Sequence, residues 1–538
     1  MRVTSRRGKL GEVFGAAARK SDTCPAGVRA LPSAKTLPMG NAEESEQAML
    51  ASVRPAGWVN PRPADRYNLV VIGAGTAGLV SAAAAAALGA KVALVERERM
   101  GGDCLNYGCV PSKALIRSAR AAAEVRGAGR FGVAVDGAIG VEFGAVMARM
   151  RRLRAELSRN DSADRFTRLG VDLFFGTARF SGADRVAVEG ATLRFRRAII
   201  ATGSRPRVPA IPGLQEAGYL TNETIFSLAE LPRRLAVIGG GPLGCELAQA
   251  FARFGSKVTL VEAASRVLPQ AEPEASEIVA RALARDGVAL MAGRQVIKVV
   301  RRGAEKAVEL ANSSGQEKIS AGEILIGTGR EAAIEDLDPE AAHVAYDKST
   351  GIKVDDFLRT SNRRIYAAGD VATAARFTHT ADAAARIAVS NALFGTRRRF
   401  SALVPVSVVY TSPEVAQAGL GVTQAKSRAL AVQTWTQPFR EVDRALIDDE
   451  TDGLVKLTAL TRRGRLVGAT IVGEHAGETV SELALAIAVG ARLADLARLV
   501  HPYPTQAEAI RKAADAYYRS RLTPGVRRLL ERFFRLLR

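Results

Sequence analysis

Residues 67–78 read YNLVVIGAGTAG, an apolar run that leads into three glycines within six positions. The run is typical of a buried strand, and the alanine-rich stretch that follows, as far as Leu88, indicates a helix. A second strand is predicted over residues 91–95 and is followed by Glu96, twenty-three residues after Gly73. A strand, a glycine turn, a helix and a strand that ends in an acid together predict a βαβ unit for dinucleotide binding.

Each part of this unit has a role in holding a pyrophosphate. Gly73 makes the tight turn, Gly75 lets the backbone approach the pyrophosphate, and Gly78 lets the helix pack on the strand. The N-terminus of the helix stabilises the anion, and the Glu96 carboxylate is expected to bind ribose hydroxyl groups.

A second unit of the same kind starts 166 residues later. The strand 235–238 (LAVI) leads into Gly239, Gly241 and Gly244, and the next strand ends in Glu262, again after twenty-three residues. Two units so far apart in the chain indicate two domains and two dinucleotides.

The acid at Glu262 bears on the identity of the second nucleotide. A carboxylate there would bind a free 2′-hydroxyl and repel a 2′-phosphate, which favours NAD over NADP. Lys257 and Arg266 lie close enough in sequence to keep NADP open.

Three later strands end in residues suited to contact a ligand, because α/β sheets bind ligands at the carboxyl ends of their strands. They read AIIATG (198–203), ILIGTG (324–329) and IYAAGD (365–370). The candidate cofactor contacts at their ends are Ala201, Thr202, Gly203, Gly329 and Asp370.

Two cysteines, Cys104 and Cys109, stand in the string GGDCLNYGCVPSK (101–113), directly after the first unit. They could be structural by chance, half of a zinc site, or a redox dithiol whose bend the neighbouring glycines supply. A zinc site would need two more ligands, but Cys24 and Cys245 lie in unsuited contexts and the chain has only four histidines. The position behind a dinucleotide unit favours the redox dithiol, and no metal site is predicted.

Composition and charge exclude several classes of protein. The 538 residues are 47% hydrophobic and 24% charged, which indicates a globular chain of about three or four domains. Four cysteines are too few for a disulfide-stapled secreted scaffold and suit a reducing compartment such as the cytoplasm. The net charge of +21 lies largely at the ends, with +6 in residues 1–38 and +7 in residues 511–538. No aromatic–basic pattern supports a nucleic-acid partner.

The two ends of the chain differ in character. Residues 1–62 are predicted to be an extension and linker without regular structure, because Pro55, Pro61 and Pro63 discourage it. Residues 523–538, which include GVRRLLERFFRLLR, are predicted to form a basic amphipathic helix. Such a helix could lie on the inner surface of an anionic membrane, or dock on its own dimer.

Eight strings of the sequence resemble those of the flavin-dependent pyridine nucleotide–disulfide oxidoreductases. This family includes dihydrolipoamide dehydrogenase, glutathione reductase and mercuric reductase, and the CxxxxC string is specific to it. The strings follow the family's order over about 63–520 and are GAGTAG (73–78), GGDCLNYGCVPSK (101–113), ATGSRP (201–206), GGGPLGCELA (239–248), GTGR (327–330), AAGDVA (367–372), YTSPEVAQAG (410–419) and HPYPTQAE (501–508).

The resemblance implies an α/β fold with two Rossmann-like dinucleotide-binding domains, for FAD and NAD, and a C-terminal α+β dimerisation domain. The implied ranges are 63–210 with 322–400 for FAD, 211–321 for NAD(P) and 401–522 for dimerisation. A homodimer is also implied, in which the C-terminal domain of each subunit completes the site of the other.

The resemblance further implies a route for the electrons. NAD(P)H passes a hydride to FAD, and the reduced flavin opens the Cys104–Cys109 disulfide. Cys109 takes the role of the charge-transfer thiolate beside the flavin, and Cys104 exchanges with a thiol or disulfide substrate. Lys113 and Glu246 match an ion pair beside the flavin ring, and Asp370 matches the acid that binds the ribityl chain. The candidate flavin contacts in these strings are Gly102, Lys113, Glu246 and Asp370.

One string departs from the usual disulfide reductases of the family. Their acid–base pair is a His five residues before a Glu, which supplies a proton to the leaving thiolate. Here Glu508 has Tyr503 at that position, and His501 stands two residues earlier. Tyr503 can donate a proton at neutral pH, and His501 could supply the base.

The branch of the family, and with it the electron acceptor, stays open. Mercuric reductase also has Tyr at the position of Tyr503, but this chain has neither the C-terminal cysteine pair nor the N-terminal CxxC module of that enzyme. The acceptor is expected to be a disulfide, a dithiol-bound metal or a related compound. The alternatives are mercuric reductase proper, dihydrolipoamide dehydrogenase, a reductase of quinones or general acceptors, and a redox-sensing protein that binds both nucleotides.

Overall fold

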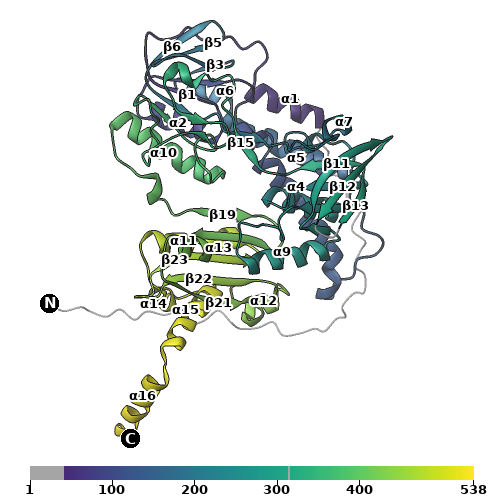
Figure 1. Ribbon diagram of the computed structural model, residues 1–538, viewed down its shortest axis with the longest axis vertical. Helices are drawn as coiled ribbons and strands as arrows, with labels where there is room; N and C mark the ends of the chain where they lie inside the picture. Colours follow the sequence, from purple (N-terminus) through teal and green to yellow (C-terminus); the bar gives the residue numbers. More distant parts are fainter. Residues whose placement is uncertain (1–41, 313–314) are drawn as a thin grey trace, which may run out of the picture. The chain divides into compact units, whose positions relative to one another are not determined.

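The computed structural model describes residues 42–538 except 313–314 (Figure 1). Its first sheet is built on the apolar run of the first glycine unit, β1 (Tyr67–Ile72), which pairs in parallel with β2 (Val92–Glu96) and β6 (Ala191–Ile200). Side chains alternate along β1, so Leu69 and Val71 enter one buried cluster and Val70 and Ile72 the other. The sheet is therefore buried on both faces.

The strand order of this sheet is β3-β2-β1-β6-β5-β4, and β18 also pairs with β6. Two helices, α2 (Thr76–Ala87) and α10 (Thr378–Phe394), pack against each other and on β6. The remaining strands of the sheet are β3 (Val171–Phe175), β4 (Arg179–Gly182), β5 (Arg185–Val188) and β18 (Ile365–Ala367).

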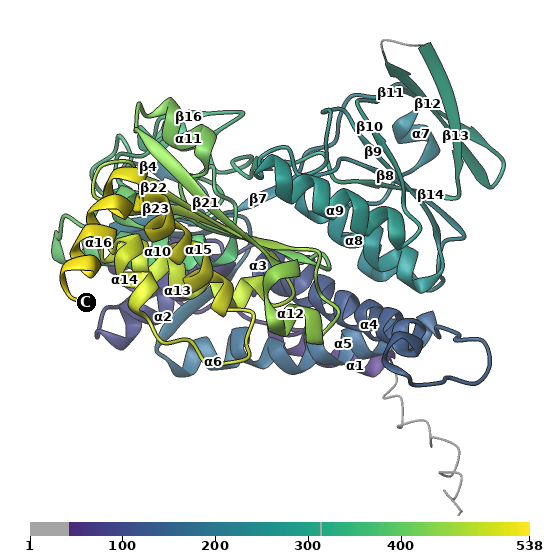
Figure 2. The ribbon, with the colours of Figure 1, turned by 90° about the horizontal axis from the view of Figure 1, so that it is seen from below.

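The second glycine unit builds a separate parallel sheet of order β10-β9-β8-β14. Figure 2 shows α8 (Pro242–Phe254) and α9 (Pro273–Arg285) along one face of it. Its strands are β8 (Arg234–Ile238), β9 (Lys257–Glu262), β10 (Ala289–Ala292) and β14 (Glu323–Ile326). An antiparallel sheet follows β10 in the chain and consists of β11 (Gln295–Arg302), β12 (Glu305–Asn312) and β13 (Gly315–Ala321).

The predicted boundary at residues 321 and 322 is wrong. β14 was expected in the FAD domain, but it pairs with β8, with Ile324 opposite Ala236 and Ile326 opposite Ile238. Its apolar side chains fill the core of the second sheet. The second domain therefore extends at least through Ile326.

The expectation of an unstructured linker is also wrong for part of its length. Residues 42–53 form helix α1 (Ala42–Val53), in which Met49 and Val53 are fully buried. The helix packs on α5 (Phe143–Ser158), and the three prolines of this region come after α1 ends. Proline discourages helix only where it stands, so the apolar residues before it decide the structure. Residues 1–41, including Cys24, lie outside the described residues.

The last sheet in the chain is antiparallel, with the order β19-β20-β23-β22-β21. Helix α13 (Ala476–Ala488) packs on β20 and β23, and α15 (Glu508–Arg521) packs on β21 and β22. The strands are β19 (Val406–Val409), β20 (Glu414–Gly419), β21 (Val432–Pro438), β22 (Leu454–Leu460) and β23 (Leu466–Gly473).

β7 pairs with β15 and β16 pairs with β17 in two small sheets, and α16 (Pro524–Leu536) follows α15. None of the helices in the described part of the chain has both the length and the hydropathy of a bilayer-crossing segment. The other elements are α6 (Ala163–Arg168), α7 (Leu214–Ala217), α11 (Val422–Ser427), α12 (Asp443–Ile447), α14 (Leu493–Arg498), β7 (Ser204–Pro206), β15 (Arg330–Ala332), β16 (Tyr346–Asp347) and β17 (Gly351–Ile352).

Candidate active site

The two cysteines of the CxxxxC string lie on consecutive helices. Cys104 is in α3 (Gly102–Asn106), and Cys109 is the first residue of α4 (Cys109–Gly127). Gly101 and Gly102 have φ of +89° and +55°, a left-handed conformation that favours glycine. Both thiols are free and partly buried, and each shifts the pKa of the other. The chain therefore bends as expected and brings the two cysteines together as a dithiol.

The two thiols differ in acidity. The hydrogen bond from Cys104 lowers the pKa of Cys109, and together with the Thr378 hydroxyl and the Lys113 charge it outweighs burial. The same hydrogen bond, followed by burial, raises the pKa of Cys104. Cys109 therefore ionises first, and Cys104 keeps its proton and donates it to the hydrogen bond.

Thr378 is a site residue that the sequence did not reveal. Its Oγ1 lies 3.1 Å from the Sγ of Cys109, and it is the first residue of α10. The positive end of the helix dipole therefore adds to the hydrogen bond in favouring a thiolate. The available signal was the polar triplet THT (378–380) at the start of an alanine-rich helix, after the strand end at Asp370.

Lys113 follows Cys109 by one turn of α4 and reaches across to α8. Its Nζ lies 2.8 Å from Oε2 of Glu246, whose Oε1 accepts the backbone N–H of Tyr410 at 2.8 Å. The Nζ also lies 4.5 Å from the centroid of the Tyr410 ring. Burial lowers the pKa of Lys113, but the charge and hydrogen bond of Glu246 more than offset it and raise the pKa. Lys113 thus stays charged next to Cys109.

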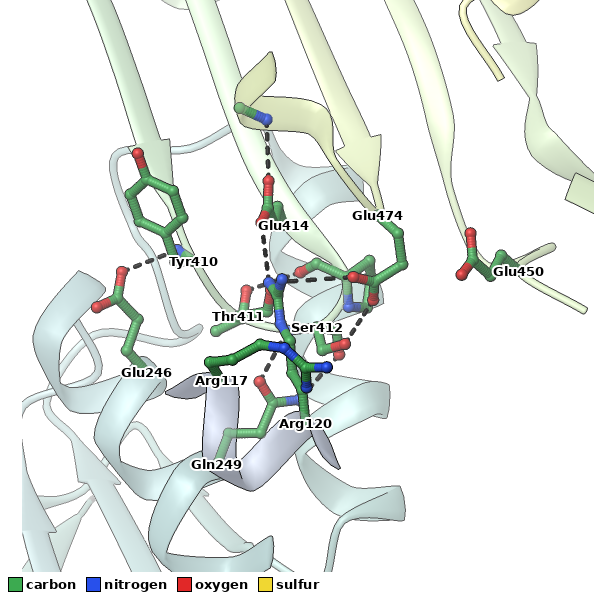
Figure 3. A network of polar contacts seen from close by, with 12 residues as sticks. Arg117, Arg120, Glu246, Gln249, Tyr410, Thr411, Ser412, Glu414, Glu450 and Glu474 are labelled. Atoms are coloured by element: carbon green, nitrogen blue, oxygen red, sulfur yellow. Dashed lines mark hydrogen bonds and ion pairs between the residues drawn. The ribbon is translucent and has the colours of Figure 1, made fainter. Parts of the chain in front are cut away.

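A second set of contacts holds α4 against the turn between β19 and β20 (Figure 3). The Nη2 of Arg120 lies 2.9 Å from Oε1 of Glu414 and donates to the carbonyl of Thr411 at 3.2 Å. Gln249 of α8 bonds both backbone groups of Ser412, at 2.8 Å each. Helices α4 and α8 and the segment 410–414 are thereby fixed to one another, which gives Cys109 a rigid support.

Both glycine turns are as close-packed as the sequence predicted. A Cβ on Gly78 would lie 1.7 Å from the carbonyl oxygen of Gly73, and one on Gly244 would lie 1.9 Å from that of Gly239. A Cβ on Gly102 would lie 2.5 Å from the Cα of Gly75, so the redox loop passes directly over the first turn. Only glycine allows these backbone approaches.

The acids that end the two units are held in the same way. Glu96 Oε2 accepts the N–H of Ala74 at 2.7 Å, and Glu262 Oε2 accepts the N–H of Gly240 at 2.6 Å. The other oxygen of each acid accepts the N–H two residues further on, at 2.8 and 2.7 Å. Each carboxylate is thus fixed beside its glycine turn with lone pairs left for a ribose.

The residues present fit a dinucleotide in each unit. At Gly241 a Cβ would meet nothing within 4 Å, so the backbone is open where a pyrophosphate would approach. At the carboxyl ends of β1 and β2, a small cavity is lined by Gly73, Glu96, Gly176 and Thr202 among others. Thr202 follows β6 in the chain, between Ala201 and Gly203. Its hydroxyl donates to the carbonyl of Ala333 at 2.6 Å.

Arg330 is a second site residue that the sequence did not single out. It follows Gly329 in the chain and lies near Asp370. Arg330 Nη2 lies 3.2 Å from Oδ1 of Asp103, next to Cys104, and its Nε lies 3.9 Å from Oδ2 of Asp370. Asp370 accepts the Ser204 hydroxyl at 2.6 Å, and burial raises its pKa. Gly329, with φ of +108°, makes the turn before Arg330.

The three C-terminal candidates lie apart from the cysteines. Within the described residues, the structure gives Tyr503, His501 and Glu508 no polar contact with either sulfur. Tyr503 is 70% exposed, and its hydroxyl donates to Asp443 at 3.0 Å. His501 is 3% exposed in its side chain and lies 3.2 Å from Glu482. Glu508 is buried and accepts from Arg511.

Cys245 in α8 lies apart from the redox pair. It is fully buried in an apolar cluster, and its thiol donates to the carbonyl of Gly240 at 3.3 Å. In the described ranges, no group of three or more His, Cys, Asp or Glu side chains is arranged to hold a metal ion.

Comparisons with known proteins identify the class. The sequence profile of the pyridine nucleotide-disulphide oxidoreductases matches residues 67–385, and the profile of their dimerisation domain matches residues 405–514. The chain belongs to the pyridine nucleotide-disulphide oxidoreductase family. It is an NAD(P)H-dependent flavoprotein, and the expected fold class and cofactors, FAD and NAD(P)H, are confirmed.

The most similar relatives come from two groups of enzymes. Mercuric reductase from Lysinibacillus sphaericus is 35% identical over 480 residues, which cover 89% of this chain and 87% of that protein. Mercuric reductase from Streptomyces lividans is 36% identical over 84% of this chain and 96% of its own length. Dihydrolipoyl dehydrogenase from Thermus scotoductus is 34% identical over 84% of this chain and 98% of its own length.

A solved structure has the same fold. The HOCl-induced flavoprotein disulfide reductase RclA from Escherichia coli superposes with a TM-score of 0.73 at 26% identity, and the match covers 84% of this chain and 99% of RclA.

Proposed function

We propose that this enzyme passes electrons from NADH to the Cys104–Cys109 disulfide and from there to a disulfide or to a thiol-bound metal. The observation that carries the proposal is the position of two free thiols on consecutive helices, with the Cys109 sulfur 3.1 Å from the Thr378 hydroxyl and the Lys113–Glu246 ion pair one turn further along α4. Bound FAD would supply hydride acceptance from NADH and electron delivery to the disulfide.

The thiols of this chain account for the second half of the reaction. Cys104 attacks the substrate disulfide as the thiolate, because its proton passes first to the neighbouring Cys109 thiolate and from there to the first leaving thiolate. The Cys109 thiolate then attacks Cys104 in the mixed disulfide, which releases the second thiol and restores the intramolecular disulfide. The second leaving thiolate takes its proton from an acid, for which we propose Tyr503 or His501 of the other subunit of a homodimer. The high exposure of Tyr503 supports its use across an interface.

NADH is the proposed reductant. Glu262 is held beside its turn with free lone pairs, and Arg266 donates to the carbonyls of Pro269 and Ala271 at 3.0 and 3.1 Å. Arg266 is therefore engaged with its own loop, and Lys257 stands at the opposite end of β9 from Glu262. These positions favour a nucleotide whose ribose has a free 2′-hydroxyl, which is NADH. We therefore expect kcat/KM to be higher for NADH than for NADPH.

The proposed setting follows from the few cysteines and from the basic helix. We place the homodimer in a reducing cytoplasm, with FAD held by residues 63–210 and 327–400 and NADH by residues 211–326. Peripheral contact with a membrane through residues 525–538 belongs to the same proposal.

Hg(II) is a second candidate acceptor, because two mercuric reductases are 35–36% identical to this chain. Two adjacent thiols suit a soft metal ion. The Cys104–Cys109 dithiol would carry the reaction with either acceptor, so the same cysteine variants test both.

A panel of acceptors tests the proposal. Steady-state NADH oxidation by the holoenzyme is measured with lipoamide, glutathione disulfide, Hg(II) in excess thiol and a quinone. We expect at least one of the first three to be turned over, and we expect Cys104→Ser to abolish that turnover while Cys245→Ala retains it. Turnover of the quinone alone, unchanged in Cys104→Ser, would replace the proposal with a general acceptor reductase.

A further inference from the structure

Helix α16 carries an apolar surface that the chain leaves exposed. It buries none of its residues. The exposed apolar side chains and their exposed fractions are Val526 41%, Leu529 67%, Leu530 39%, Phe533 53%, Phe534 57%, Leu536 86% and Leu537 67%.

The charges of α16 and of the residue or two beyond it lie on the opposite side. At 3.6 residues per turn, the apolar residues fall within one half of the helix circumference and the charged residues within the other. The charged residues are Arg527, Arg528, Arg532, Arg535, Arg538 and Glu531. Among the residues that the structure describes, one of these arginines has an ion pair, Arg527 with Glu531 at 3.8 Å, so the polar side keeps a strong positive charge.

We propose that α16 lies in the surface of an anionic lipid bilayer, with its apolar side among the acyl chains and its arginines among the headgroups. Aromatic and leucine side chains opposite arginines are the composition of helices that lie in this interface. Thirteen residues form a helix of about 20 Å, which suits a position in the plane of the surface. The inference rests on the proposed peripheral location and does not depend on the electron acceptor.

Two observations favour lipid over a second copy of this helix. The family's dimerisation domain matches residues 405–514, so α16 starts ten residues after the matched region ends. Two copies that joined their apolar sides would also bring their arginine rims together, and like charges at short distance repel. Anionic headgroups would instead neutralise these charges.

Vesicle flotation with the full-length, FAD-loaded protein tests the inference. Vesicles of phosphatidylcholine with about 30% phosphatidylglycerol present the anionic surface, and pure phosphatidylcholine is the reference. We expect the protein to float with the anionic vesicles. Binding to the neutral vesicles, and binding to the anionic vesicles at high salt, should each be about tenfold weaker or more.

Two variants and a matched control separate the apolar and the charged contributions. Phe533→Ser with Phe534→Ser, and separately Arg528→Gln with Arg532→Gln, should each weaken binding about tenfold or more. Leu88→Ser with Phe394→Ser changes two other side chains that are 60% and 62% exposed and should bind as the unchanged protein does.

Vesicle binding and NADH oxidation are measured separately, so a failure of one proposal can be told from a failure of the other. NADH oxidation without vesicles should be the same in all these variants, so a redox failure is seen independently of binding. Absence of flotation, equal binding to neutral vesicles, or equal loss in the control variant would overturn the inference. Dissociation of the dimer in the Phe533→Ser, Phe534→Ser variant, seen by light scattering, would assign the apolar side to a second copy and overturn it as well.

Discussion

The Nζ of Lys113 lies 2.8 Å from Oε2 of Glu246, and this ion pair ties the helix that begins with Cys109 to the helix that follows the second glycine turn. The side chain of Glu246 is 5% exposed and that of Lys113 is 35% exposed. The pair therefore bears both on the relative position of two domains and on the charge beside the reactive sulfur.

Replacement of Glu246 by glutamine should leave Lys113 without its counter-charge. Removal of one partner of a fully buried pair costs about 3–5 kcal/mol, and the partial exposure of Lys113 reduces our expectation to about 1–2 kcal/mol. Denaturant unfolding of the FAD-loaded protein measures the change. Glu124→Gln, which breaks an exposed pair with Arg117, is the control and should cost nothing measurable; equal effects of the two variants would show that the Lys113–Glu246 pair is not structural.

The ionisation of Cys109 should respond to its neighbours. Thr378 and Lys113 both favour the thiolate, so their removal raises the pKa of Cys109 and shifts the pH at which it becomes reactive upward. We expect the midpoint of iodoacetamide alkylation in the reduced protein to lie below that of free cysteine. Thr378→Val and Lys113→Met should each raise it by about one pH unit.

The neighbouring Thr380→Val is the control for that experiment, because Thr380 lies on the same helix and makes no polar contact with either sulfur within the described part of the chain. Its midpoint should equal that of the unchanged protein. An unaltered midpoint in Thr378→Val would mean that the hydroxyl does not support the thiolate.

The glycines of the two units should separate the two cofactors. Gly78→Ala forces a Cβ against the backbone of Gly73 and should yield protein that lacks FAD. Gly241→Ala meets no atom of the chain within 4 Å, so it should keep the fold and the FAD and raise the KM for NADH. Flavin absorbance and steady-state kinetics measure these effects; a loss of FAD in Gly241→Ala would reverse the assignment of the two units.

Helix α1 should stabilise the redox loop through Arg154. Arg154 is 7% exposed in its side chain, pairs with Glu46 of α1 and donates to the carbonyl of Asn106 at 3.0 Å, between the two cysteines in sequence. Glu46→Gln leaves this guanidinium buried without a partner charge and should cost about 2–4 kcal/mol in unfolding free energy. Glu44→Gln, on the exposed side of the same helix, should have no effect, and an equal loss in both would contradict this role.

Local patterns account for what the sequence predicted correctly. Both glycine turns, the acids that end their second strands and the CxxxxC bend are each formed within about thirty residues, so spacing alone describes their geometry. The positions of Glu96 and Glu262 beside their turns are examples, since each carboxylate bonds the residue after the first glycine.

Contacts between distant residues explain what the sequence missed. Thr378 stands 269 residues after Cys109, and Glu414 stands 294 residues after Arg120, so no spacing rule connects them. β14 was predicted to begin the second FAD segment, and its pairing with β8 assigns it to the other domain. For α1, two buried apolar residues outweigh the prolines that follow.

The proposed reaction depends most on electron transfer to the Cys104–Cys109 pair, with Cys109 as the thiolate. An anaerobic titration of the FAD-loaded protein with NADH, followed by absorbance, measures this directly. We predict a long-wavelength charge-transfer band that is complete after two electrons and is absent in Cys109→Ser. Direct bleaching of the flavin after two electrons, without that band in the unchanged protein, would contradict the central claim.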